Sequence, residues 1–174
     1  TFILFLVAAL GAVIFLAIEA RGKEPMLPLS LFKIKTISIL NFSGFLLGFV
    51  LIVSSFYIPL WVQGITLKNA TMSGIAMMPM SVTWLFGSIA AGKMLPKYSI
   101  GKISVGGTFI IALGSFGLTL FQTSTPIPFM MAVTATMGFG YGLAFTTFTV
   151  AVQSAVEWKR RGAAMGSHTL MRNL

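Results

Sequence analysis

The chain alternates between long runs that carry no charged residue and short clusters rich in Lys and Arg. The longest charge-free run extends from Ile103 to Val156 and is broken only by a turn sequence that contains Pro126 and Pro128. A bilayer core about 30 Å thick requires about 20 apolar helical residues to cross. This run is therefore long enough for two membrane-spanning helices joined by a tight turn.

Charge-free windows divide the rest of the chain in the same way. We expect membrane spans near residues 1–18, 36–67, 69–92, 103–123 and 129–156, and a sixth span starting after residue 161. The windows are too long for strands and lack the alternation of period two that strands show. The predicted fold class is an all-α membrane protein with five transmembrane helices plus the start of a sixth. Residues 19–35 are expected to form a cytoplasmic linker before a partial helical bundle over residues 36–174.

The composition agrees with a membrane protein. The chain is 56% hydrophobic and only 9% charged, with a mean hydropathy of +0.94, whereas a typical globular domain is about 25% charged. The absence of Cys excludes disulfides and thiolate metal sites. The net charge of +9 does not indicate a nucleic-acid partner, because the basic residues lie in short clusters between apolar runs. The expected partner is the lipid bilayer.

The basic clusters predict how the chain crosses the membrane. Of the 12 basic residues, all except Lys68 follow the first, third or fifth predicted span. Lys and Arg accumulate in cytoplasmic loops, so we expect a multi-pass protein of the cell membrane whose basic loops are cytoplasmic. The chain starts inside one apolar run and ends as another begins, which indicates a fragment of a longer protein.

Enzyme chemistry has little support in the sequence. His168 is the only histidine, and the acids Glu19, Glu24 and Glu157 lie outside the predicted spans. Neither a catalytic triad nor a metal-ligand cluster can be assembled from these residues. We therefore expect no enzyme, no metal and no cofactor. A proton relay would need a carboxylate inside the membrane, which would have to lie elsewhere in the protein.

Glycines recur within and after the fifth predicted span, at Gly138, Gly140, Gly142, Gly162 and Gly166. Small residues let helix backbones approach closely, so these positions are predicted to pack helices together. A functional alternative is that such smooth faces slide or rock during a conformational cycle.

Five motifs in order connect the chain to a known family. Tyr57-Ile-Pro59-Leu-Trp-Val-Gln63 and Ser73-Gly74-Ile-Ala-Met-Met-Pro79 come first, after the acidic, Pro-containing linker that begins at Glu19. Next come Gly92-Lys93-Met-Leu-Pro96-Lys97 with Gly101-Lys102, then the glycine-rich fifth span, and then Arg161-Gly162-Ala-Ala-x-Gly166. Together they resemble the second half of a major facilitator superfamily transporter, in the fourteen-span drug:proton antiporter branch.

The third motif resembles a degenerate copy of the superfamily's cytoplasmic loop motif, Gly-x-x-x-Asp-Arg-x-x-Gly-Arg. Gly92, Lys93, Lys97, Gly101 and Lys102 occupy this loop. Pro96 stands where the motif has Asp, and the spacing to Gly101 is one residue longer. The loop keeps its basic character and lacks the acid of a charge relay.

The resemblance implies a secondary active transporter fragment that performs proton-coupled multidrug efflux by alternating access. Its implied partners are a small amphipathic substrate, protons bound outside this fragment, and the missing amino-terminal half. Two alternatives remain open from the sequence. A transporter of the same fold could carry a metabolite such as an amino acid or a sugar, or the chain could be a non-transporting membrane scaffold or enzyme subunit.

Four residues are candidates for the wall of a substrate cavity. Asn41 and Gln153 are costly to leave unpaired in hydrocarbon, so they are predicted to face protein or a water-filled cavity. Trp84 lies too deep for the interfacial aromatic belt, and Tyr141 is a second aromatic at membrane depth. Packing is the competing explanation for the two aromatics. Further apolar candidates for a permissive wall are Phe42, Phe45, Phe49, Met77, Met78 and Met80.

Overall fold

The computed structural model describes residue 10 and residues 33–173, and in these residues it contains helices and no strand. The elements are α2 (Lys35–Leu60), which continues as one π-helical segment, η2 (Trp61–Ile65), then α3 (Ala70–Met94), α4 (Ile100–Thr119), α5 (Ile127–Ser154), the short η3 (Trp158–Arg160) and α6 (Arg161–Asn173). The predicted span 1–18 and linker residues 19–32 lie outside the described residues, apart from residue 10.

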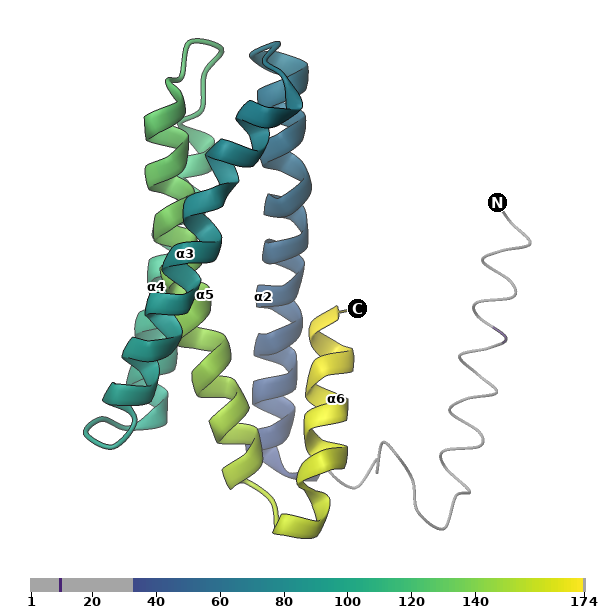
Figure 1. Cartoon of the computed structure of the whole chain (residues 1–174). Helices are drawn as coiled ribbons and strands as arrows, with labels where there is room; N and C mark the ends of the chain where they lie inside the picture. Colours follow the sequence, from purple (N-terminus) through teal and green to yellow (C-terminus); the bar gives the residue numbers. More distant parts are fainter. Residues whose placement is uncertain (1–9, 11–32, 174) are drawn as a thin grey trace.

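Four of these helices are long and apolar enough to cross a membrane, namely Lys35–Ile65, Ala70–Met94, Ile100–Thr119 and Ile127–Ser154. The all-α membrane class is therefore confirmed. Helices that follow one another in the chain run in opposite directions, so the packed pairs α3–α5 and α2–α6 are parallel, and the shorter α6 lies beside the first half of α2 (Figure 1).

The predicted span 103–123 differs from the structure at both ends, because α4 begins at Ile100 and ends at Thr119. Beyond Thr119, the Gln122 amide donates to Thr125 Oγ1 at 2.6 Å, and the Thr125 amide donates to the Gln122 carbonyl at 2.9 Å. These local bonds satisfy the turn and replace helical bonds. Pro126 then precedes α5, where its missing N–H costs nothing.

α5 is the central helix of the described bundle. It packs most extensively against α3 on one side and α4 on another. Its buried residues include Met130, Met137, Tyr141 and Phe145, which belong to the main apolar core. α6 packs mainly against α2. The bundle therefore consists of a tight group of α3, α4 and α5, joined by the α2–α6 pair.

Charged residues gather at one end of the bundle. The start of α2, the α3–α4 turn and the α5–α6 turn lie at that end, whereas the turns after η2 and after α4 lie at the other (Figure 1). The shared end carries Lys33, Lys35, Lys93, Lys97, Lys102, Lys159, Arg160 and Arg161, and the opposite end carries Lys68. Arg172 departs from this pattern. The sequence grouped it with the basic loop after the fifth span, but it lies in the last turn of α6.

Candidate functional site

An aromatic stack joins α3 to α5 within the bundle. The Trp84 ring lies 5.6 Å from the Tyr141 ring and 5.5 Å from the Phe145 ring, measured between centroids. Tyr141 and Phe145 stack on each other at 5.7 Å with an interplanar angle of 7°. The two α5 rings are buried and Trp84 is half-buried. The structure thus brings together two of the four predicted cavity residues, and Trp84 is the member with a partly accessible surface.

Glycines on two faces of α5 set its distance from its neighbours. A Cβ atom at Gly138 would collide with the Met80 carbonyl oxygen of α3, and one at Gly142 would collide with the Trp84 carbonyl oxygen. On another face, a Cβ at Gly140 would lie 2.7 Å from Ile111 Cγ1 of α4. The bare glycine surface therefore lets three helix backbones come together.

The two glycines predicted for packing in α6 behave differently. A Cβ added at Gly162 or Gly166 would meet no heavy atom within 4 Å among the described residues. Both glycines are exposed in the described part of the bundle. Their packing role therefore stays a prediction, which would require a helix outside residues 33–173.

Asn41 does not open onto a cavity in the described residues. Its Nδ2 donates to Ser167 Oγ at 3.2 Å, and its Oδ1 lies 3.3 Å from His168 Nδ1. Asn41 is 2% exposed. One turn further along α2, a Cβ atom added at Gly44 would lie 2.7 Å from Cε1 of the His168 ring. The amide therefore takes part in a polar contact between α2 and α6, whereas the sequence left open whether it faces protein or a water-filled cavity.

Gln153 lies apart from the aromatic stack. It is half-buried in the last turn of α5. Eight residues separate it from Phe145, which corresponds to about 12 Å along a helix axis. The sequence window extended to residue 156, so Gln153 was expected at membrane depth. Because α5 ends at Ser154, the side chain lies close to the cationic end of the bundle.

The predicted loop motif forms the turn between α3 and α4. Gly92 and Lys93 lie in the last turn of α3, Lys97 lies in the loop, and Gly101 and Lys102 lie in the first turn of α4. All five are exposed, and within residues 33–173 none of the three lysines forms an ion pair. The turn is closed by backbone bonds, such as the one from the Tyr98 amide to the Met94 carbonyl at 2.9 Å.

The sequence analysis identified neither Phe145 nor Arg172 as a candidate site residue. The guanidinium carbon of Arg172 lies 5.2 Å from the Phe145 ring centroid, in the geometry of a cation–π contact. The side chain is half-buried. The small and apolar residues from Gly162 to Gly166 could have indicated that Arg172 lies in a helix and not in a loop. We call Trp84, Tyr141, Phe145 and Arg172 the arginine–aromatic site.

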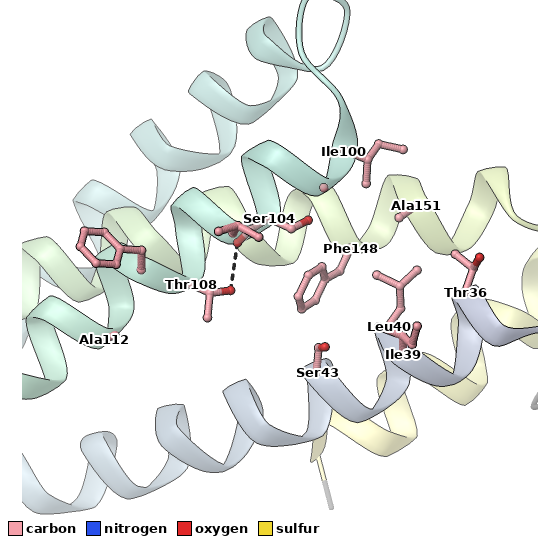
Figure 2. Close-up of a pocket in the computed structure, with 13 residues that line it drawn as sticks. Thr36, Ile39, Leu40, Ser43, Ile100, Ser104, Thr108, Ala112, Phe148 and Ala151 are labelled. Atoms are coloured by element: carbon pink, nitrogen blue, oxygen red, sulfur yellow. Dashed lines mark hydrogen bonds between the residues drawn. The ribbon is translucent and has the colours of Figure 1, made fainter.

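A separate apolar groove lies between α2, α4 and α5, with a volume of about 660 Å³ (Figure 2). Its wall includes Leu40, Phe109 and Phe148, and its polar groups are hydroxyls, of which Thr108 donates to the Ser104 carbonyl at 2.9 Å. None of the four predicted cavity residues lines this groove. Among the described residues no charged side chain lines it either, so they offer only apolar contact and weak hydrogen bonding.

Metal chemistry has no basis in the part of the chain that is described. Residues 33–173 contain no group of three His, Asp or Glu residues that could hold a metal ion.

Comparison with known proteins gives a consistent result. The family described as Major Facilitator Superfamily matches residues 1–174. The multidrug transporter protein MdtP of Bacillus subtilis is 30% identical over 171 residues, which cover 98% of this chain and 32% of that protein. Multidrug resistance protein 3 of the same organism is 25% identical, over 98% of this chain and 33% of that protein. The tetracycline resistance determinant of Streptomyces rimosus is 24% identical, over 94% of this chain and 48% of that protein. The chain thus spans about a third of the length of the first two relatives.

Proposed function

Because the chain belongs to the major facilitator superfamily, we propose that it is part of a secondary active transporter that exports small amphipathic compounds in exchange for protons. The described helices would form part of one bundle that rocks against a second bundle around a cavity near the membrane midplane. The second bundle and the proton-coupling carboxylates would come from the rest of a longer protein. As members of a transporter family are in general not enzymes, no catalytic residue is assigned.

The observation that carries this proposal is the similarity to drug-efflux proteins along almost the whole chain. MdtP and multidrug resistance protein 3 each align with 98% of it. The geometry is compatible with such a role, since α3 carries the half-buried Trp84 against two buried rings of α5, and the described spans contain no carboxylate. A permissive surface of this type suits amphipathic compounds better than small ionic nutrients.

We also propose that the protein lies in the cell membrane with its basic loops in the cytoplasm. The gathering of cationic side chains at one end of the helices supports this orientation. The exposed loop motif between Gly92 and Lys102 would then lie on the cytoplasmic side, where its lysines remain hydrated.

The proposal is tested with the full-length protein in inside-out membrane vesicles. An inwardly acidic pH gradient should drive uptake of a fluorescent amphipathic dye, and a protonophore should abolish it. Vesicles without the protein provide the control for passive leakage. Dye uptake that ignores the gradient would contradict proton exchange. Gradient-driven uptake of an amino acid or sugar, with no dye uptake, would favour the metabolite transporter instead.

A further inference from the structure

Arg172 lies near the middle of the membrane when its position is counted along three helices. It follows the start of α6 by 11 residues, which is about 16 Å along the axis. Gly48, against which it packs, follows the start of α2 by 13 residues, or about 20 Å. Trp84 precedes the end of α3 by ten residues, or about 15 Å. All three starting points lie at the cationic end, so the arginine–aromatic site lies about halfway through a core of about 30 Å.

A cation at this depth requires a partner or a water-filled cavity. Glu157 is the only acid in residues 33–173, and it lies in the α5–α6 turn without an ion pair to Arg172. The described partner of the guanidinium is the face of the Phe145 ring. Within residues 33–173 the guanidinium donates no hydrogen bond, so its N–H donors are available, and their fork matches the two oxygens of a carboxylate.

Glycines on neighbouring helices fix both ends of the arginine–aromatic site. The backbone carbonyl of Arg172 lies directly against Gly48 of α2, and the backbone carbonyl of Trp84 lies directly against Gly142 of α5. A Cβ atom at either glycine would collide with that carbonyl. The backbones that carry the indole and the guanidinium are therefore held by close helix contacts, which favours a preorganised site.

We propose that Trp84, Phe145 and Arg172 bind a planar aromatic anion, with its carboxylate on the guanidinium and its ring against the half-buried indole. This inference rests on the proposed transport function and narrows its substrates to anionic aromatic compounds. The positive charge of Arg172 attracts such anions and disfavours cationic dyes of similar size. Trp84 supplies stacking surface for compounds with or without the charge.

The test is equilibrium binding of two matched probes to the purified full-length protein in detergent. The probes are 9-anthracenecarboxylate and its neutral amide, which differ in charge and share the ring. Wild-type protein should bind the carboxylate at least tenfold more tightly than the amide. Arg172→Gln should remove most of this preference while changing amide binding less than twofold, and Arg172→Lys should retain part of it. Trp84→Leu should weaken both probes alike.

Lys159→Gln is the control, because it removes an exposed cation from the α5–α6 turn and should change neither affinity. Equal wild-type affinity for the two probes would overturn the proposal. So would an equal loss of both in Arg172→Gln, which would indicate that the arginine pairs with a carboxylate elsewhere in the protein. Binding needs no proton gradient, so absent dye transport with intact carboxylate preference would refute the proposed function and leave the site standing.

Discussion

Replacing Gly142 with Ala should separate the two most closely packed helices of the bundle. The added methyl group would collide with the Trp84 carbonyl oxygen, and it would lie 2.7 Å from the Ser88 amide nitrogen and 2.9 Å from the Gly87 Cα. All three atoms belong to the α3 backbone, which cannot rotate away as a side chain could. Either α3 moves as a whole, or the helices lose contact along their length.

The expected cost follows from overpacking a close-packed interior, which typically destabilises a protein by about 1–3 kcal/mol. Ala is also a better helix former than Gly by about 1 kcal/mol, which offsets part of that loss. Gly106→Ala in α4 provides the matched control, because it gains the same propensity and its new methyl group meets nothing within 4 Å among the described residues. The free energy of unfolding of Gly142→Ala should therefore fall about 1–3 kcal/mol below that of Gly106→Ala.

The assay is reversible unfolding of the full-length protein in mixed micelles, with the denaturing detergent as the variable and tryptophan fluorescence as the signal. Both variants must first elute as single species on size exclusion. Equal unfolding free energies for the two variants would show that α3 and α5 do not approach at Gly142 as described, and the packing argument would fail.

Two further predictions concern a hydrogen bond and the orientation. Thr134 is buried, and its hydroxyl lies 2.7 Å from the Ala76 carbonyl of α3. Thr134→Val should lower the unfolding free energy by about 0.6 kcal/mol and at most about 1.7 kcal/mol. Thr136 is exposed and its hydroxyl donates within its own helix, so Thr136→Val should have less effect. A larger effect of Thr136→Val would contradict the interhelical bond. In a cysteine-free full-length background, Lys97→Cys and Lys68→Cys should react with a membrane-impermeant maleimide from the cytoplasmic and the opposite side, respectively. Labelling of both from one side would refute the proposed orientation.

The helices could be predicted from the sequence because hydrocarbon permits few alternatives for the backbone. A run such as 103–156 must satisfy its backbone groups internally, so it folds as helices. The ends were harder to predict, since hydrophobicity continues beyond the point where the helix stops. Phe121 remains apolar and buried after α4 has ended, and the Gln122–Thr125 bonds that form the turn are invisible in a hydropathy pattern.

The site was harder to predict than the fold, because each side chain's role depends on which helix faces it. Asn41 was expected to face protein or a water-filled cavity, and its partners Ser167 and His168 lie more than 120 positions away in the chain. Arg172 was assigned to a loop, since a charged residue usually marks the end of a span. Its place beside Phe145 follows from α6 packing against both α2 and α5, which no local pattern encodes.

Packing and the arginine–aromatic site are connected through two glycines, and this connection separates two classes of variant. Gly142 touches the backbone of Trp84, and Gly48 touches the backbone of Arg172. A methyl group at either glycine therefore displaces a binding residue by moving its helix. The unfolding free energy of the protein and its affinity for both anthracene probes should then fall together. Removing the guanidinium in Arg172→Gln leaves these backbone contacts in place, so the carboxylate preference should fall with little change in amide binding. The ratio of the affinities for the carboxylate and the amide thus distinguishes a site whose residues are displaced from a site that has lost its positive charge.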